Sequence, residues 1–466
     1  MTESLLGSAA RPLKIAVIGS GPSGFYAAGS LLGRPELHVQ VDIFDRLPTP
    51  YGLVRGGVAP DHQKIKNVIR KYIKIAESDG FRFFGNVHVG VDIQVDELAA
   101  HYDQLVFSVG NESDRKMGID GEELEGVFSA TEFVGWYNGH PDFKDRNFAL
   151  TESKRVAVVG NGNVAMDVAR VMARHPDELA ETDIAEYALN LLRRSTVEEV
   201  LLWGRRGPAQ AAFSPSEIKE LGNIESADLV VTTEQVELDE ITGRWLEQSA
   251  SRDAQKNMAY LTNRSLVGEG ENTRKVRCEF LVSPVEFIGE NGRLTAVKLM
   301  RNELYESDDG TPRPRSTGET YIEKVDMVFK AIGYRGVRIP GVPFHEAWGI
   351  FPNRDGRLVD PDTDQVIAGQ YVCGWAKRGP SGLIGTNKAC SEATVTAMLE
   401  DIEAQSGGDL PSIENTLRAK EIDFVTFADW QNLDRAEQEL GEAIGKIREK
   451  FTEVTEMMSA IRKMRN

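Results

Sequence analysis

The chain has 466 residues, enough for two or three domains. Its apolar fraction of 41% and charged fraction of 27% are typical of a soluble globular protein. No stretch reaches the roughly eighteen apolar residues that a membrane-spanning helix needs, so a membrane span is excluded. A net charge of −18 argues against a nucleic-acid binder, which needs a basic surface.

Cysteine and histidine usage narrows the possible chemistry. The three cysteines, Cys278, Cys373 and Cys390, form no CxxC pair. An all-cysteine iron–sulfur cluster needs four thiolates, so we expect no such cluster on this chain, and a disulfide-built fold is excluded as well. The scarcity of cysteine fits a reducing, cytoplasmic compartment. The histidines lack metal-ligand spacing, so no metal site is expected.

Two segments share the pattern of a buried strand, a glycine turn and a helix start. Lys14–Gly24 reads KIAVIGSGPSG, and Arg155–Ala165 reads RVAVVGNGNVA. Their first glycines, Gly19 and Gly160, are 141 residues apart, about one domain's length. We therefore expect an α/β protein with two dinucleotide-binding, Rossmann-like domains and parallel sheets. Further buried strands are expected at Val39–Phe44, Gln104–Val109, Val200–Trp203, Asp326–Ile332 and Tyr371–Gly374.

The first glycine loop has the spacing of a dinucleotide-binding turn at Gly19, Gly21 and Gly24. The first glycine allows the tight turn, the second lets backbone approach a pyrophosphate, and the third lets strand and helix pack closely. The helix N-terminus then offers free N–H groups to the phosphates. An acidic residue about twenty positions later should bind a ribose. Asp45, at the end of the second strand, suits this role better than Asp42, which lies within the strand.

The second loop, Gly160–Ala165, has alanine in the third position and is followed by basic residues. The strand Val200–Trp203 leads into Arg205 and Arg206, where an NAD site would place an acid. Two guanidinium groups suit the 2′-phosphate of NADP, which a carboxylate would repel. The alternative is a pair of solvated surface arginines. The long spacing requires the helical stretch Asp177–Ser195 to be an insertion in the crossover.

The rest of the chain separates into helical and β-rich stretches. Helices are expected at His62–Ser78, Val164–Arg174, Pro215–Leu221 and Asn387–Gln405, and charged surface helices within Asp434–Arg465. The middle, residues 226–325, carries polar turns between short runs such as Val276–Phe287 and Leu294–Met300. This pattern predicts a β-rich elaboration of the second domain.

Five longer motifs resemble one known family. They read PYGLVRGGVAPDH (Pro50–His62), VFSATEFVGWYNG (Val127–Gly139), GNGNVAMDVAR (Gly160–Arg170), GRRGPAQAAF (Gly204–Phe213) and GWAKRGPSGLIGTNK (Gly374–Lys388). In this order they are similar to adrenodoxin reductase and its bacterial ferredoxin–NADP reductase relatives. The resemblance implies FAD in the first domain, NADP(H) in the second and a ferredoxin-type iron–sulfur protein as transient partner. We expect a discontinuous FAD-binding domain (residues 12–112 and 335–466) around an NADP-binding domain (residues 113–334).

The resemblance also assigns residues to the two cofactors. Beside the glycines of the first loop, it implies FAD contacts at Ser23, Asp45, Leu53 and Val89, and flavin-ring contacts at Trp375, Gly382, Leu383 and Ile384. It implies NADP contacts in the second loop at Gly160, Asn161, Gly162, Asn163 and Val164, and beyond it at Arg205, Arg206, Glu217 and Gly382. Family members usually carry glutamate where Asp45 stands. The helix after Gly382 would direct its N-terminus at the flavin and favour negative charge there.

Two residues are candidates for catalytic roles, although hydride transfer depends more on stacking geometry than on a proton donor. His62 follows Asp61 at an expected helix start, where a histidine is often structural, but the resemblance places it near the flavin. Glu217 fits a capping box with Ser214. The resemblance places it beside the nicotinamide, which requires its carboxylate to turn away from the cap.

The expected activity is NADPH:ferredoxin oxidoreduction, with hydride passing from NADPH to FAD and single electrons leaving to an external iron–sulfur protein. That protein would in turn feed a cytochrome P450 or another ferredoxin-dependent enzyme. Ferredoxins of this type are acidic, as is this chain, so docking needs a local basic face. One candidate stripe contains Lys64, Lys66, Arg70, Lys71 and Lys74.

Other functions stay open for a chain with these motifs. One is a flavin-dependent NADPH oxidoreductase or monooxygenase acting on a small molecule. Another is an electron-transfer subunit of a larger complex. A disulfide reductase is disfavoured, because it needs a redox pair of cysteines and this chain has no paired cysteine motif.

Overall fold

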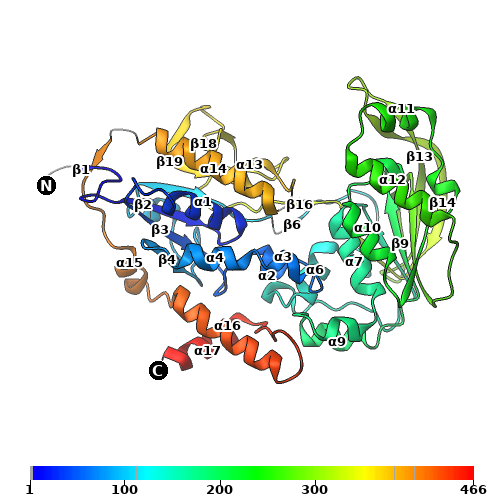
Figure 1. Ribbon diagram of the computed structural model, residues 1–466, viewed down its shortest axis with the longest axis horizontal. Coiled ribbons are helices and arrows are strands. Elements are labelled where there is room, and N and C mark those ends of the chain that lie inside the picture. The colour runs from blue at the N-terminus through cyan, green and yellow to red at the C-terminus, as the bar shows by residue number, and fades with distance from the viewer. Residues whose placement is uncertain (1–3, 112, 383, 403–404, 466) are drawn as a thin grey trace.

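The computed structural model describes residues 4–111, 113–382, 384–402 and 405–465, which form two lobes (Figure 1). The first lobe is built on a seven-stranded sheet in the order β17-β18-β19-β5-β2-β3-β4. The strands from β19 to β4 run parallel, and β17 and β18 are added antiparallel at one edge. Their bounds are β2 (Leu13–Ile18), β3 (Val39–Phe44), β4 (Phe81–Phe84), β5 (Gln104–Phe107), β17 (Asn353–Arg354), β18 (Arg357–Val359) and β19 (Val366–Val372).

The core of the first lobe joins the two ends of the chain. Helix α1 (Pro22–Leu32) packs against helix α14 (Ile384–Glu400), and both cover the sheet. Phe25 and Leu31 of α1 share one apolar cluster with Val395 and Met398 of α14. Parallel strands buried on both faces must be apolar throughout, as the LKIAVI run of β2 is. This shared core positions the C-terminal segment beside the first glycine loop.

The second lobe is built on a six-stranded parallel sheet in the order β10-β11-β9-β8-β15-β7. Helix α7 (Asn163–Ala173) packs between α6 (Ala130–Tyr137) and α10 (Pro215–Gly222). The strand bounds are β7 (Val127–Ser129), β8 (Arg155–Val159), β9 (Glu199–Gly204), β10 (Ala227–Val230), β11 (Arg274–Phe280) and β15 (Met327–Lys330). Each lobe therefore has its own parallel sheet, as predicted from the repeated glycine motif.

The predicted β-rich elaboration is a three-stranded antiparallel sheet of β12 (Val282–Glu290), β13 (Arg293–Glu306) and β14 (Pro312–Lys324). A single strand over Val276–Phe287 is wrong, because Leu281 has a φ of 58° and divides β11 from β12. The part before residue 266 is also not β-rich. It holds helices α11 (Glu240–Gln248) and α12 (Arg252–Ser265), whose first turns are capped by the side chains of Asp239 and Ser251.

The expected long helix at His62–Ser78 is divided into α3 (Gln63–Lys66) and α4 (Ile69–Ala76). Hydrogen bonds from the N–H of Val68 to the carbonyl of Ile65 and from that of Arg70 to that of Asn67 replace the α-helical pattern at the junction.

The connection between the lobes is a short antiparallel pair of β6 (Ser113–Asp114) and β16 (Tyr334–Arg335). The chain leaves the first lobe along one strand and returns along the other.

The C-terminal tail runs along the first lobe toward the second (Figure 1). Helices α16 (Phe427–Glu442) and α17 (Val454–Arg465) bury Trp430, Leu433 and Met457 in the first lobe's core. The segment between them, residues 443–453, is not helical and buries Lys446 and Lys450. The expectation of charged surface helices over the whole of 434–465 is therefore wrong for this segment, which is an internal contact.

The remaining elements are short. They are β1 (Ser4–Leu5), α2 (Leu53–Gly56), α5 (Val95–Ala99), the 3₁₀ turns at Pro141–Phe143, Pro208–Gln210 and Glu234–Val236, α8 (Pro176–Ala180), α9 (Glu186–Leu192), α13 (Trp375–Arg378), β20 (Ser406–Gly407) and α15 (Ile413–Ala419). In the described part of the chain, every helix is too short or too polar to cross a bilayer.

Candidate functional site

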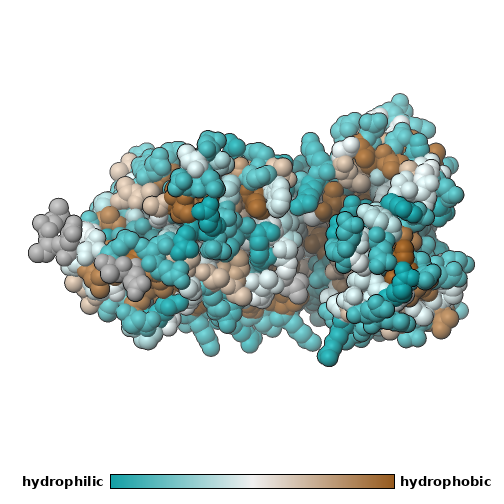
Figure 2. All heavy atoms as spheres, turned by 90° about the horizontal axis from the view of Figure 1, so that it is seen from above, coloured by the Kyte–Doolittle hydropathy of each residue, from teal (hydrophilic) through white to brown (hydrophobic). Residues whose placement is uncertain are grey.

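A cleft of about 2010 Å³ lies between the two lobes and is visible as a furrow across the molecule (Figure 2). It is about twice the ~1000 Å³ of a large small-molecule pocket. Leu383 falls outside the described residues, and Gly24 lies behind the cleft wall, packed on Gly19. The other predicted site residues line the cleft: Gly19, Gly21, Ser23, Asp45, Leu53, His62, Val89, Gly160, Asn161, Gly162, Asn163, Val164, Arg205, Arg206, Glu217, Trp375, Gly382 and Ile384.

The first glycine loop has a different constraint at each of its three glycines. Gly19 has a φ of +107°, and a Cβ there would lie 2.9 Å from the backbone of Ser108. A Cβ at Gly24 would overlap the carbonyl oxygen of Gly19. A Cβ at Gly21 would meet nothing within 4 Å, so this backbone faces open space. Helix α1 begins at Pro22 without a side-chain cap, which leaves N–H groups of its first turn for a ligand.

Asp45 stands beside this loop at the end of β3. Its carboxylate accepts hydrogen bonds from the N–H of Ser20 (3.0 Å), from the Ser20 hydroxyl and from the N–H of Leu47 (2.9 Å). Asp42 is fully buried, where it binds Arg82 and, at 2.6 Å, the hydroxyl of Tyr102. Only Asp45 reaches the cleft, so the preference for it over Asp42 agrees with the geometry.

The C-terminal segment closes the cleft beside the first glycine loop. Gly374 has a φ of +70°, and a Cβ there would overlap the side chain of Ser23. The Ser391 hydroxyl donates to the carbonyl oxygen of Ser23 at 2.9 Å. The Trp375 ring lies 5.6 Å from that of Tyr334, and its buried indole Nε1 has no hydrogen-bond partner. Residues more than 350 positions apart are thus in contact at the first loop.

The second loop repeats this arrangement in the other lobe. Gly160 has a φ of +135°, and a Cβ there would overlap the carbonyl oxygen of Ala331. A Cβ at Gly162 would meet nothing within 4 Å, and α7 begins after it without a side-chain cap. The side-chain nitrogen of Asn161 is buried with no hydrogen-bond partner. This loop therefore also presents unpaired donors to the cleft.

Arg205 and Arg206 follow β9 in the wall of the cleft. Among the residues described, no carboxylate forms an ion pair with either of them. Burial lowers the pKa of Arg206, and the neighbouring Arg205 charge adds to the effect. Two adjacent cations without a counter-ion make a site for a polyanion.

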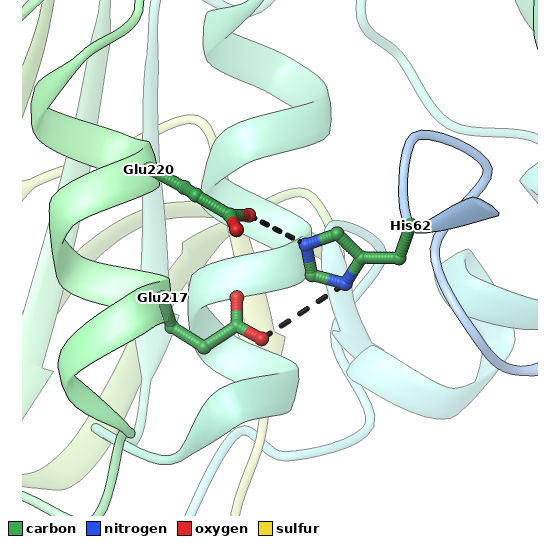
Figure 3. Close-up of side chains that lie close together, drawn as sticks. All are labelled: His62, Glu217 and Glu220. Carbon is green, nitrogen blue, oxygen red and sulfur yellow. Dashed lines mark hydrogen bonds and ion pairs between the residues drawn. The ribbon is translucent and has the colours of Figure 1, made fainter. Parts of the chain in front are cut away.

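His62 and Glu217 meet across the cleft in a cluster of charged side chains (Figure 3). The His62 ring lies 2.7 Å from Glu220 through Nε2 and 3.9 Å from Glu217 through Nδ1. Burial raises the pKa of Glu217, and the nearby Asp167 carboxyl raises it further. Beneath them the fully buried guanidinium of Arg170 binds Glu217 at 2.7 Å and also Asp61 and Asp167. The guanidinium of Arg170 is thus the positive charge that pairs with these buried carboxylates.

The capping-box prediction at Glu217 is half correct. The N–H of Glu217 donates to the Ser214 hydroxyl at 3.5 Å, but its carboxylate turns away to Arg170. The side chain is therefore free of the cap and faces the cleft. The atoms of His62, Glu217 and Glu220 lie within 4.8 Å of one another, a spacing at which they could also ligate a metal ion.

Comparison with known proteins gives consistent results. A family model for pyridine nucleotide-disulphide oxidoreductases matches residues 13–200. The chain is 41% identical to NADPH-ferredoxin reductase FprA of Mycobacterium leprae, covering 95% of this chain and 97% of that one. It is 38% identical to the mitochondrial NADPH:adrenodoxin oxidoreductase of Arabidopsis thaliana, covering 97% and 96%. The chain belongs to the family of FprA and the adrenodoxin reductases.

A solved structure agrees with this assignment. The fold matches Mycobacterium tuberculosis FprA in complex with NADPH with a TM-score of 0.91, at 39% identity over 97% of this chain and all of that one. The predicted resemblance and α/β fold class are both confirmed.

The residues present fit the two dinucleotides of this family. A dinucleotide carries phosphate and carbonyl oxygens that accept hydrogen bonds, and the cleft offers buried donors without partners. These are Asn161 Nδ2, Trp375 Nε1 and Asn111 Nδ2, beside two uncapped helix starts. Each lobe supplies a set, so the cleft fits one dinucleotide on each side.

Two residues of the site, Asn111 and Glu220, were not predicted from the sequence. Asn111 follows strand β5, and the carboxyl ends of parallel strands are where α/β sheets bind ligands. Glu220 lies one helical turn after Glu217, so the two carboxylates share a face of α10.

Proposed function

We propose that this chain is an NADPH:ferredoxin oxidoreductase that binds FAD on the first lobe and NADP(H) on the second. The observation that carries the proposal is that two glycine loops open into one cleft, and that the second is followed by the unpaired cations Arg205 and Arg206. The domain limits go with it: residues 12–112 and 335–466 would hold FAD, and 113–334 would hold NADP(H). The β6–β16 pair at these limits supports them.

The first lobe would hold FAD through its glycine loop. The backbone around Gly21 and the start of α1 would receive the pyrophosphate, and Asp45 would accept a hydrogen bond from the ribose. Leu53, Val89 and Trp375 would contact the flavin, together with residues 382–384. When bound, FAD accepts an electron pair from NADPH and releases electrons singly to an iron–sulfur protein.

The second lobe would hold NADP(H) in the matching way. Residues Asn161–Val164 would receive its pyrophosphate at the start of α7, and Arg205 and Arg206 its 2′-phosphate. Glu217, freed from its cap, would accept a hydrogen bond from the nicotinamide carboxamide. His62 would hold a proton at Nε2 against Glu220 and fill the space between the lobes.

The partner would be an acidic ferredoxin-type iron–sulfur protein that docks transiently. Of the predicted basic stripe, Lys64, Arg70, Lys71 and Lys74 are exposed, but Lys66 is buried and binds Asp183. The stripe is therefore smaller than predicted. A reducing, cytoplasmic location belongs to the proposal, since all three cysteines are free thiols.

Anaerobic absorbance titration of the purified protein with NADPH and, separately, NADH tests this proposal. We expect a flavin spectrum that NADPH bleaches at far lower concentration than NADH. Addition of an oxidised [2Fe–2S] ferredoxin should then restore the flavin colour. An equal response to both nucleotides would refute the 2′-phosphate site, and a protein that cannot be loaded with FAD would refute the function.

A further inference from the structure

A buried ionic cluster outside the cofactor cleft joins the two lobes. The carboxylate of Asp183 receives two hydrogen bonds of 2.7 Å from the ammonium of Lys66 and lies 2.9 Å from that of Lys450. Gln63 donates a further hydrogen bond of 2.9 Å. Asp183, Lys66 and Lys450 are 4%, 6% and 5% exposed, so water takes little part in this contact.

The three charges come from three separate parts of the chain. Asp183 precedes Ile184 and Ala185, which lie in the core of the second lobe. Lys66 is the last residue of α3. Along the chain, α3 lies between strands β3 and β4, which both belong to the first lobe's sheet. Lys450 belongs to the tail segment between α16 and α17, whose flanking helices pack on the first lobe. The carboxylate of one lobe is thus inserted between two cations of the other.

Lys450 also connects this cluster to the cleft. Its ammonium donates to the carbonyl oxygen of Arg55 at 3.3 Å and to that of Asn138 at 3.1 Å. Arg55 lies on α2, which contributes residues to the first lobe's wall of the cleft, and Asn138 follows α6 in the second lobe. One side chain therefore spans the flavin-side wall and the second lobe.

Further contacts of the same tail segment reinforce the junction. Lys446 donates to the carbonyl oxygen of Ile184 at 2.6 Å, and the N–H of Ile447 donates to that of Glu181 at 3.3 Å. Both acceptors flank Asp183 on the second lobe.

Because the three charged groups are buried, each of them depends on the others as its partners. Burial lowers the pKa of Lys450 to about 7 and also lowers that of Lys66. The lysine charges outweigh the effect of burial on Asp183 and lower its pKa. Removing one member of the cluster would leave a charge buried without a partner, which is strongly destabilising, whereas the intact cluster adds little net stability. Such a cluster contributes more to the orientation of two bodies than to their stability.

We propose that Asp183, Lys66 and Lys450 form an interlobe anchor that sets the position of the nicotinamide-binding lobe against the flavin-binding lobe. The inference rests on the proposed function, because hydride transfer between groups on different lobes depends on their relative placement. Asp183 and Lys450 are then positioning residues. They touch neither cofactor site directly but hold the two sites in register.

The decisive variant is Lys450→Met in the FAD-loaded protein, because it leaves Asp183 and Lys66 as a neutral pair. The matched control is Glu453→Gln, which removes the Lys144–Glu453 ion pair. That pair also joins the tail to the second lobe, but its two side chains are 28% and 44% exposed. Three readouts separate positioning from folding: affinity for 2′,5′-ADP, the stopped-flow rate of flavin bleaching at saturating NADPH, and amide hydrogen exchange.

We expect K450M to slow flavin bleaching by roughly 10- to 100-fold. Its affinity for 2′,5′-ADP should be unchanged, because this fragment of NADP binds to the second lobe alone. Exchange should quicken at residues 137–140 and 181–186, and K450R, which keeps the charge, should recover part of the rate. E453Q should match the wild type throughout.

Two results would overturn the anchor. One is a K450M protein that bleaches at the wild-type rate with unchanged hydrogen exchange. The other is a K450M protein that loses 2′,5′-ADP binding or FAD in proportion to its rate, since that is general damage. If NADPH fails to bleach even the wild-type flavin, the proposed function fails instead, and hydrogen exchange still decides whether the anchor holds the lobes.

Discussion

The two glycine loops share one local construction but differ in what surrounds it. In both, the first glycine has a positive φ and the second faces open space. The third position is Gly24 in one loop and Ala165 in the other. After the second strand, the first lobe has the acid Asp45 and the second has two arginines. The glycine turn fits a pyrophosphate, and the residues at the end of the next strand determine which dinucleotide is bound.

The difference at the third position has a steric cause. A Cβ at Gly24 would overlap the carbonyl oxygen of Gly19 and lie 2.9 Å from the Ser108 hydroxyl. In the second lobe, Ala165 carries a Cβ and is fully buried in the core. Helix α1 therefore approaches its glycine turn more closely than α7 can.

Substitutions at Gly24 and Ala165 test this steric difference. Gly24→Ala should weaken FAD binding by at least about tenfold, or ~1.4 kcal/mol, because the turn must move away from the pyrophosphate. Ala165→Gly should cost only ~0.5–1 kcal/mol of stability and leave NADPH binding intact. Flavin content after gel filtration and thermal unfolding measure both. A G24A protein that keeps its FAD would show that the close approach is not required.

The arginine pair tests the second difference. Replacing Arg205 and Arg206 by alanine removes two charged partners of a 2′-phosphate, so NADPH affinity should fall roughly 100-fold or more. Affinity for NADH should change little. The matched control is the double alanine variant of Arg193 and Arg194, another basic dipeptide of the same lobe. Anaerobic titration checks this, and a parallel loss for NADH would contradict the 2′-phosphate assignment.

The parts of the structure that were predictable are those that a local pattern specifies. The strand–glycine–helix units, Asp45 over Asp42, and the position of the arginine pair all follow from spacing along a few dozen residues. Contacts between distant segments were less accessible. Arg170 is part of a predicted helix, yet nothing in the sequence shows that it is fully buried beneath His62 and Glu217.

Two of the errors concern charged residues. A lysine in a basic stripe is usually solvated, so the sequence places Lys66 in the candidate docking stripe. The structure buries it because Asp183 from the other lobe supplies a counter-charge. Lys450 is a second case. The charged composition of the tail predicts a surface position, but Lys450 is buried and pairs with Asp183. Tertiary pairing of charges has no sequence period, whereas apolar burial does.

Glu217 tests whether the second lobe also supplies a group at the nicotinamide. Glu217→Gln should slow flavin bleaching by NADPH about tenfold. Because burial and Asp167 raise the pKa of this carboxyl above 4.5, the wild-type rate should fall on its acid side as the carboxylate takes a proton. The Glu217→Gln variant should not show this fall in rate at low pH. Ser214→Ala removes the cap but keeps the carboxylate, and an equal loss there would assign the effect to the helix end.

The smallest effect concerns the point where both lobes meet. Burial, with Lys66 and Arg55 nearby, lowers the pKa of Lys450 to about 7 in the folded chain despite Asp183, against 10.5 when exposed. Between these values the unfolded chain binds a proton that the folded chain does not, so raising the pH favours folding. The unfolding temperature of the wild type minus that of K450M should therefore rise from pH 7 toward 10.5. Glu453→Gln should show no such trend, because its partner Lys144 has a pKa raised above 10.5 by that glutamate. Parallel pH profiles for wild type and K450M would mean that Lys450 keeps its proton in the fold, and the two lobes would then be joined through a permanently charged contact.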